Sequence, residues 1–203
     1  MKNEMTDKTI NDQALDTLFR EARTIDNFED RPVPGPLLQQ IYELARMAPT
    51  SANCQPMRIL FLTSPESRDR LAPALSSTNR EKSLRAPVTA VIAYDLAFPG
   101  TLSKLYRVPG AEHWFAGDAM IQETAFRNSS LQGAYVILAA RSLGLDVAPM
   151  SGFDNNQVDE EFFSGGIYKT WRSNFICNLG YGDMSSLPPR DPRPDFADAC
   201  AVL

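Results

Sequence analysis

The stretch Glu123–Asp154, ETAFRNSSLQGAYVILAARSLGLDVAPMSGFD, decides the fold of this chain. Over Ala125–Leu143 its apolar residues cover most of a helical circumference instead of a single stripe. A helix that is apolar all round belongs inside a core, and about 20 residues give it a length of roughly 30 Å. Gly144 follows where a left-handed C-terminal cap is expected, and Leu145–Ala148 is typical of a short buried strand. The stretch therefore predicts a core helix, a strand and a loop.

That loop, Pro149–Asp154, leaves the buried helix and strand directly. Loops that a rigid scaffold holds in place are where proteins tend to bind ligands. Gly152 would let the backbone approach a bound molecule closely, because glycine has no Cβ. From this stretch alone, a glycine that is needed only for the turn is an equal alternative.

Length, charge and cysteine content restrict the class of protein. The 203 residues are most simply one domain, with an extended tail over about residues 185–203. With 20 basic and 25 acidic residues, the net charge of −5 argues against a nucleic-acid or membrane surface. Cys54, Cys177 and Cys200 are widely spaced, so neither a disulfide framework nor a metal site is indicated. No apolar run approaches the roughly 18 residues of a membrane span, and we expect a cytoplasmic protein.

The chain has a single histidine, His113, which excludes most schemes that pair a histidine with other catalytic groups. It also has no GxGxxG, GxxxxGK[ST] or HExxH motif. A nucleotide would therefore have to be bound by another arrangement.

Hydrophobic periodicity predicts alternating helices and strands. The helices are expected at residues 9–22, 36–47, from Ser64-Pro65 onward and at 155–163, and the strands at 58–63, 88–94, 145–148 and 173–182. Residues 88–94 are almost continuously apolar, as a sheet covered on both faces requires. Residues 76–82 are interpreted as a polar turn. Residues 97–117 are either a mobile cover over a pocket or a plain surface excursion, and the proline-rich segment 187–194 is stiff chain that lies across another surface.

Four separated segments together resemble the FMN-dependent nitroreductase family. They are Arg23-Thr24, residues 48–56 (APTSANCQP), residues 149–154 (PMSGFD), and Gly180-Tyr181-Gly182 with Pro189-Arg190. Their order and spacing match the family over nearly the whole chain. The resemblance implies an α+β fold, a nitroreductase-like α/β sandwich with a central mixed sheet flanked by helices around a buried core helix. It also implies an intertwined homodimer with FMN at the subunit interface.

The resemblance further implies roles for individual residues. Arg23, Thr24 and Arg190 would hold the FMN phosphate, because guanidinium groups bind phosphate oxygens bidentately. Asn79 and Lys82 match positions at the flavin pyrimidine edge and N1, where a cation stabilises the anionic reduced flavin. The cofactor-binding set that the resemblance implies is Arg23, Thr24, Pro49, Thr50, Ser51, Ala52, Asn53, Gln55, Asn79, Lys82, Pro149, Met150, Ser151, Gly152 and Arg190.

Within this set, Thr50–Asn53 would reach the flavin from the other subunit with Gln55 close by, and Gly152 would donate its backbone N–H to flavin N5. Taken singly, each segment has a plainer interpretation. Arg23 is then a solvated arginine at a helix end, Asn79 and Lys82 are exposed turn residues, and residues 50–53 form an ordinary turn.

Three positions depart from the family pattern. Ser151 stands where many relatives have an acidic residue, Pro188 or Pro189 replaces a lysine, and Asp26 replaces a basic residue. These changes leave the phosphate short of one or two positive charges, and Arg193 is the candidate replacement.

Three further segments are similar to the malonic semialdehyde reductase branch of bacterial pyrimidine utilisation: residues 74–77 (ALSS), 126–130 (FRNSS) and 149–154. In the expected reaction NADPH or NADH passes a hydride to flavin N5 and leaves, and malonic semialdehyde is then reduced to 3-hydroxypropionate on the same face. No catalytic side chain is required, because the cofactor carries the chemistry. Arg127 or Arg58 would meet the substrate carboxylate, unless both sit in structural ion pairs.

The alternatives are a nitro compound, quinone or enone as acceptor, a flavin-binding sensor or carrier without turnover, and a structural protein with a degenerate site. The sequence does not choose between NADPH and NADH.

Overall fold

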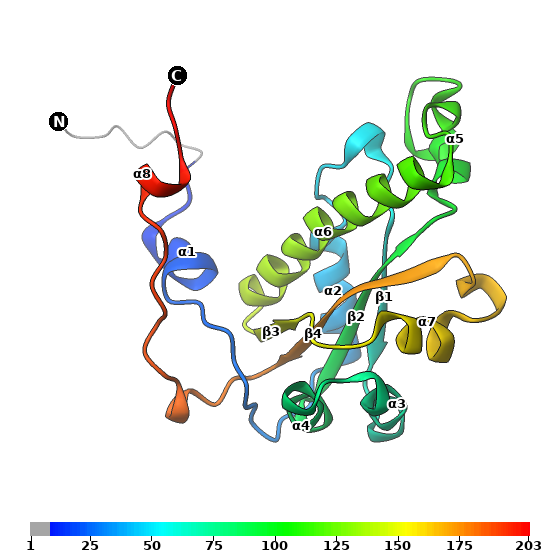
Figure 1. Ribbon diagram of the computed structural model, residues 1–203. Coiled ribbons are helices and arrows are strands. Elements are labelled where there is room, and N and C mark those ends of the chain that lie inside the picture. Colours follow the sequence, from blue (N-terminus) through cyan, green and yellow to red (C-terminus); the bar gives the residue numbers. More distant parts are fainter. Residues whose placement is uncertain (1–8) are drawn as a thin grey trace.

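A four-stranded sheet between two layers of helices forms the body of the protein (Figure 1). The computed structural model describes residues 9–203, apart from the side chain of Ser186. The strands are β1 (Met57–Leu62), β2 (Val88–Asp95), β3 (Asp146–Met150) and β4 (Trp171–Gly180), in the order β1-β2-β4-β3. One face packs against α2 (Gly35–Ala45) and α6 (Asp118–Ser142), the other against α3 (Pro65–Leu71) and α7 (Asn155–Phe163). The α+β class is confirmed.

Strand β2 shows why the sheet needs both layers. All of its residues are buried. Val88, Ala90 and Ile92 pack in the cluster formed with α2 and α6, whereas Val91 and Ala93 pack in the cluster formed with α3 and α7. Successive side chains of a strand point to opposite faces, so both sets must be covered. The prediction of a strand covered on both faces is confirmed.

The prediction of a mixed sheet is wrong for the named strands, because every pair of them is antiparallel. Helix α6 does connect two strands that run in the same direction, β2 and β3, as a crossover should. However, β4 inserts between those two strands and runs antiparallel to both. The parallel pairing among the described residues is the isolated bridge between Thr24 and Val147.

Helix α6 is buried on one side only, although its sequence predicts burial all round. Val136, Ala139 and Ala140 pack on the sheet. Away from this contact Leu131 and Tyr135 are 50% and 40% exposed, and Phe126, which packs edge-on against Tyr94 of β2, is 48% exposed. The helix ends as predicted, with Gly144 in the left-handed region at φ 80°. A single copy of the chain therefore leaves half of its apolar core helix open to solvent.

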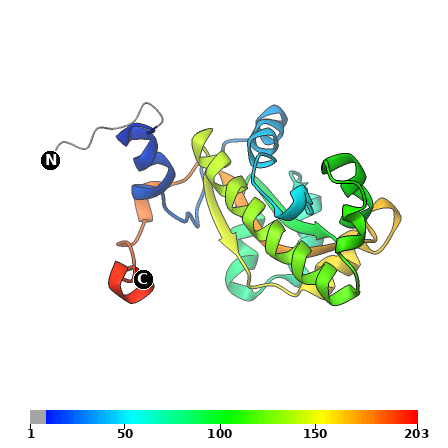
Figure 2. The ribbon, with the colours of Figure 1, turned by 90° about the horizontal axis from the view of Figure 1, so that it is seen from above.

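The N-terminal segment and the C-terminal tail both lie away from the body (Figures 1 and 2). The helix predicted for residues 9–22 is present as α1 (Asp12–Leu15), which continues as the π-helical turn η1 (Asp16–Arg20). The tail runs beside it and ends with α8 (Phe196–Ala199). As predicted, the proline-rich tail lies across another surface, here the N-terminal segment.

The interpretation of residues 76–82 as a polar turn is wrong, because they form most of α4 (Ser77–Arg85), which packs beside α3. Helix α3 begins with the predicted cap, since Ser64 and Ser67 form a capping box. Short helical turns complete the chain: η2 (Ser51–Asn53), η3 (Ala72–Ala74), η4 (Phe98–Thr101), α5 (Leu102–Leu105), η5 (Ala111–Trp114), η6 (Gly166–Tyr168) and η7 (Met184–Ser186). Within residues 9–203, none of the helices combines the length and apolar character that crossing a bilayer requires.

Candidate functional site

A pocket of about 480 Å³ lies between the N-terminal segment and the tail. Arginine side chains join the N-terminal segment to the tail. Arg190 Nη2 donates to the carbonyl oxygens of Arg20 and Ala22 at 2.7 and 2.9 Å, and Arg23 Nη2 donates to Pro188 O at 2.6 Å. The pocket is lined by Phe19, Ala22, Arg23, Thr24, Asp26, Asn27, Arg141, Asp183, Leu187, Pro188, Pro189, Arg190, Asp191 and Arg193. The structure thus brings together the three residues predicted to bind phosphate.

Four arginines line this pocket, namely Arg23, Arg141, Arg190 and Arg193. None of them forms an ion pair with a carboxylate among the described residues. Their described hydrogen bonds go to backbone carbonyl groups, which leave the positive charges uncompensated. Guanidinium groups gathered in this way suit a phosphate or another small oxyanion.

Arg141 was not among the predicted residues. It is half-buried in the last turn of α6, and its Nη1 donates to Leu18 O at 3.0 Å. Burial above all lowers its pKa, and Arg190 adds to this effect, while Cys177 and Asp146 oppose it. An anion bound beside a half-buried cation would offset this cost of burial. A signal was present in the sequence, since Arg141 is the one charged residue in the second half of the predicted core helix.

Carboxylates also reach the pocket, through Asp26, Asp183 and Asp191. Asp26 is paired, because its Oδ2 lies 2.7 Å from Nζ of Lys82 on α4. The side chain and the backbone N–H of Ser185 both donate to Asp183 and lower its pKa. Arg193, the proposed replacement for a missing lysine, lines the pocket while donating to the carbonyl oxygens of Asp191 and Pro192. The arginines outnumber the acidic groups.

Gly152 lies beside helix α4. Its carbonyl oxygen accepts hydrogen bonds from Ser76 N at 3.0 Å and from Asn79 Nδ2 at 3.1 Å. A Cβ at this position would lie 2.6 Å from Asn79 Nδ2 and 3.0 Å from Ser76 Oγ. A side chain at this position would displace the Asn79 amide group, which donates to Gly152 O. Gly152 is exposed, and its N–H makes no hydrogen bond within residues 9–203.

Helix α4 connects these features. Asn79 reaches Gly152, and one turn later Lys82 reaches Asp26 at the edge of the pocket. Pro149 and Met150 end strand β3, opposite Cys177 and Ile176 of β4, and the exposed Ser151 leads to Gly152. The structure thus links these predicted residues to the arginine-lined pocket through one short helix.

The predicted segment Thr50–Gln55 is held in a strained conformation. Ala52, Asn53 and Gln55 have φ angles of 48°, 50° and 42°, which cost energy for residues with a Cβ. Polar groups of α6 hold the segment. Ser51 N donates to Asn128 Oδ1 at 2.8 Å, and Gln132 Nε2 donates to Gln55 Oε1 at 2.7 Å. Asn53, Ser51 and the preceding Pro49 are exposed, and Thr50 is half-buried, so the segment presents polar groups to the outside.

One chain does not bring this segment to the pocket. The segment contacts α6 at Asn128, whereas the pocket contacts α6 at Arg141. Arg141 lies thirteen helical positions beyond Asn128 and nine beyond Gln132, which also holds the segment, or about 20 and 14 Å along the axis at the standard rise. If the segment and the pocket belong to one site, as the resemblance implies, a second copy of the chain would have to complete it.

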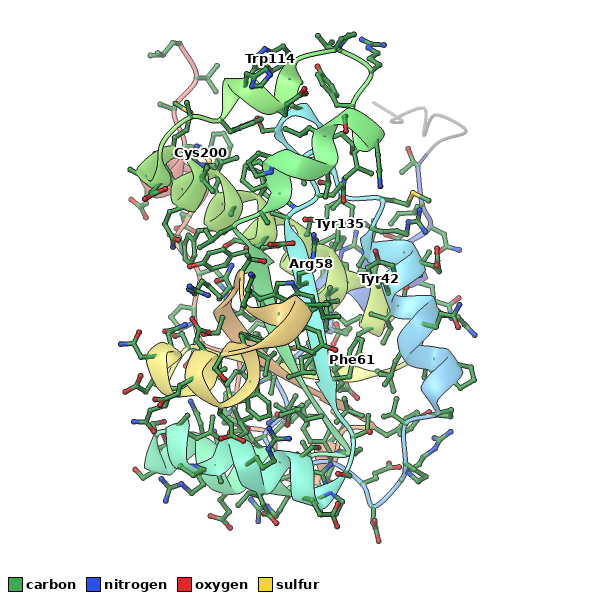
Figure 3. The ribbon with its side chains drawn as sticks, turned by 90° about the vertical axis from the view of Figure 1, so that its right-hand side faces the viewer. Tyr42, Arg58, Phe61, Trp114, Tyr135 and Cys200 are labelled. Carbon is green, nitrogen blue, oxygen red and sulfur yellow. The ribbon has the colours of Figure 1, made fainter. Side chains whose placement is uncertain are left out.

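The two arginines considered for a substrate carboxylate are both engaged. Arg58 Nη2 lies 2.8 Å from Asp95 Oδ2, and both side chains are largely buried. Arg127 pairs with Glu123 one turn earlier on α6, where both are more than half exposed. Figure 3 shows Arg58 in the middle of the molecule, and Trp114 at the end opposite to α3 and α4.

Residues 97–117 pack around a cluster of their own. Phe98 and Leu102 are fully buried, with Cys54 and Ala125 in the same cluster. Asn53 Nδ2 donates to Leu105 O at 2.7 Å, so this segment also supports the strained loop. Whether it moves as a cover stays a prediction.

The profile of the nitroreductase family matches residues 19–181. A protein of Burkholderia lata is 52% identical over 195 residues, which cover 96% of this chain and 98% of that protein. A protein of Caulobacter sp. is 52% identical over 192 residues, which cover 94% and 96%. Both carry the provisional name NADH dehydrogenase/NAD(P)H nitroreductase.

Solved structures show the same fold. A provisionally named nitroreductase from Exiguobacterium sibiricum, in complex with FMN, has a TM-score of 0.82 at 20% identity and covers 97% of this chain and 100% of its own. An enone reductase of gut-bacterial fatty acid saturation metabolism has a TM-score of 0.79 at 17% identity, with coverage of 96% and 100%.

Proposed function

The chain belongs to the nitroreductase family, and from that premise we propose that it is an FMN-dependent oxidoreductase that takes electrons from NADPH or NADH. The observation that carries the proposal is the pocket lined by four arginines, none of which forms an ion pair with a carboxylate among the described residues. A flavin mononucleotide differs from riboflavin by its phosphate, and that group is what such a pocket selects. The 52% identical relatives, which are named as NAD(P)H nitroreductases, support the reaction class.

The residues present fit FMN. Arg23, Thr24, Arg141 and Arg190 would hold the phosphate. The exposed N–H of Gly152 is free to donate to the flavin, and Asn79 and Lys82 would bind its pyrimidine edge. Bound FMN would supply the hydride chemistry, accepting and returning a hydride at N5. The contribution of the chain is then to orient the flavin and to leave one of its faces open for the two substrates in turn.

The active unit in this proposal is a homodimer, with one flavin site at each end of the subunit interface. Apolar side chains on α2 and α6 are exposed in the single chain, and Figure 3 labels Tyr42 and Tyr135 on these two helices. The exposed set on and beside the two helices is Tyr42, Leu44, Met47, Met120, Phe126, Leu131 and Tyr135. Exposed apolar area of this kind marks an interface. A partner on this face could bring its strained Thr50–Gln55 segment to the flavin.

The acceptor that we propose is malonic semialdehyde. NADPH or NADH and one proton would reduce the aldehyde to the alcohol 3-hydroxypropionate. Support comes from the segments shared with that branch, two of which meet in the structure: Leu75 bridges Phe153, and Ser76 N donates to Gly152 O. Arg127 is the better candidate for the substrate carboxylate, since its exposed pair with Glu123 is weak and can be exchanged.

A second candidate is an uncharged acceptor, such as a nitro compound, quinone or enone. It is favoured by the engagement of Arg58 with Asp95, which leaves one of the two candidate arginines unable to bind a substrate carboxylate. A cytoplasmic location is part of the proposal, because the free cysteines suit a reducing compartment.

Anaerobic titration tests the proposal. The purified protein, loaded with FMN, should lose its yellow colour on addition of NADPH or NADH and regain it with the true acceptor. Malonic semialdehyde, a nitrofuran, a quinone and an enone should be compared, with Arg127→Gln measured beside the parent. Loss of turnover with malonic semialdehyde alone in this variant would support the aldehyde. A flavin that neither nucleotide bleaches would instead indicate a carrier or sensor, and failure to retain FMN would refute the proposal.

A further inference from the structure

Asp26 and Lys82 form an ion pair at the edge of the phosphate pocket, with 2.7 Å between Asp26 Oδ2 and Lys82 Nζ. We infer that Asp26 offsets the positive charge that Lys82 presents to the bound flavin, and thereby keeps the reduction potential of the flavin low. This inference rests on the proposed FMN site. Asp26 would lower the reduction potential of the flavin in two ways, by pairing with Lys82 and by the negative charge of Asp26 itself.

The backbone on both sides of the pair is fixed. Ile25, directly before Asp26, is fully buried, and its N–H donates to Val147 O at 3.2 Å. Thr24 forms the parallel bridge to Val147. Asp26 is therefore held against strand β3, and its side chain is not placed by a free loop.

Lys82 is fixed from the other side. Its helix α4 is tied to the Gly152 loop by the hydrogen bonds of Ser76 and Asn79 to Gly152 O. The Lys82 side chain is 32% exposed and that of Asp26 is 54% exposed, so the pair lies at the surface of the pocket and not in the core. The pair can thus stay in place beside a ligand that docks on Gly152.

The charged side chain next to Lys82 on α4 forms an ion pair of its own and does not compete for Lys82 or Asp26. Glu81, the neighbour of Lys82 on α4, pairs with Arg85 at 3.1 Å. Among the described residues, Asp26 is the carboxylate that pairs with Lys82, and Lys82 is the cation that pairs with Asp26. Reduction adds negative charge to a flavin, and a lone ammonium group beside it would favour the reduced form. A carboxylate at 2.7 Å turns that charge into a dipole, whose field falls off faster with distance.

Measurement of the midpoint potential of bound FMN, against a reference dye under anaerobic conditions, tests the inference. Asp26→Asn should shift the potential in the positive direction. Each 30 mV for this two-electron couple corresponds to a tenfold change in the preference for reduced over oxidised flavin. Lys82→Gln should shift the potential in the negative direction. Asp26→Glu should restore a value close to that of the parent, because it keeps the charge.

Asp30→Asn is the matched control, since Asp30 is exposed, lies four residues further along and forms no ion pair among the described residues. Its potential should equal that of the parent. An unchanged potential in Asp26→Asn, or a positive shift in Lys82→Gln, would overturn the inference while FMN stays bound. If the parent protein itself retains no FMN, the proposed function fails first, so the two failures are distinguishable. Asp26→Ser provides a second neutral variant in case the asparagine destabilises the segment.

Discussion

At the scale of single residues, Arg141 joins the core helix to the phosphate pocket. Its helix packs on the sheet, and its side chain reaches the pocket wall, where one N–H group is satisfied by Leu18 O. Arg23 and Arg190 line the same pocket. We expect a bound phosphate to complete this arrangement, since charge-assisted hydrogen bonds are the strong ones in proteins.

Replacement of Arg141 by glutamine should therefore weaken FMN binding by roughly 10- to 100-fold, the equivalent of one charged hydrogen bond. Riboflavin, which lacks the phosphate, should bind the variant and the parent equally. Quenching of flavin fluorescence on titration into apoprotein measures both affinities. Arg70→Gln is the control, because Arg70 pairs with Glu161 on the surface away from the pocket. Equal losses for FMN and riboflavin would show that Arg141 acts on folding alone.

Two of the three cysteines should be unreactive. Burial raises the pKa of Cys54 to about 11 and that of Cys177 to about 12. At about pH 8, only about one thiol in a thousand or fewer is then present as the reactive thiolate, and the fraction rises about tenfold for each pH unit. In a Cys200→Ser variant, Ellman's reagent should modify no thiol near pH 8 until denaturant is added. Rapid reaction of the folded variant would contradict these pKa values.

The family resemblance was sufficient to group Arg23, Thr24 and Arg190, which line one pocket in the structure, and their role in holding a phosphate stays a prediction. The resemblance was insufficient for Arg141 and for the pairing of Asp26, since the partners of these residues lie far away along the chain or on another element. A charge on a helix gives no indication of which pocket it will reach until the tertiary packing is known.

At the scale of elements, the end of β4 is packed against the start of β2 and the N-terminal segment. Gly180 lies in this contact. A Cβ there would lie 2.9 Å from both Cδ and Cγ of Pro87 and 2.7 Å from Phe28 Cδ1. The proline ring cannot turn aside as a flexible side chain could. The close approach of β2 and β4 at this end therefore depends on a residue without a side chain.

Gly180→Ala should lower the free energy of unfolding by about 1–3 kcal/mol, as overpacking does in cores. Urea denaturation followed by circular dichroism measures the change. Gly165→Ala is the matched control, because nothing lies within 4 Å of a Cβ at that position and its φ is negative. We expect the control to change stability by no more than about 0.5 kcal/mol. Similar losses in both variants would argue against a packing role for Gly180.

Most of the helices and strands follow from periodicity in the sequence, including α7 and β2. Helix α4 was missed, because its sequence STNREKSLR contains a single apolar residue and therefore has no apolar stripe. The mixed sheet was expected wrongly, because the insertion of β4 between β2 and β3 is a long-range pairing. Local patterns set the type of an element but not its neighbours.

At the scale of the whole molecule, the exposed side of α6 carries the strongest argument for a second copy. Leu131 is 50% exposed in the middle of a helix whose other side packs on the sheet. The contacts of the strained Thr50–Gln55 segment lie about 14 to 20 Å along that helix from Arg141 in the pocket. Both observations are explained if two chains pack through α6 and each completes the site of the other.

Leu131→Arg should place a charge in this interface and convert a dimer into a monomer with weakened FMN binding. Light scattering coupled to gel filtration measures the mass, and the ratio of flavin to protein absorbance measures the bound FMN. Ile167→Arg is the control, because Ile167 is an apolar residue that is 80% exposed on η6, outside α2 and α6. It should remain dimeric and yellow. A Leu131→Arg protein that keeps both properties would exclude α6 as the interface.

The contact between the two ends of the chain has a consequence for biosynthesis. Arg190 donates to Arg20 O across 170 positions, so one wall of the arginine-lined pocket leaves the ribosome long before the other. A nascent polypeptide cannot close that pocket until Arg190 has left the ribosome. Loading with the vitamin-derived cofactor is therefore a late event, and cells starved of riboflavin should accumulate a fully synthesised but colourless protein.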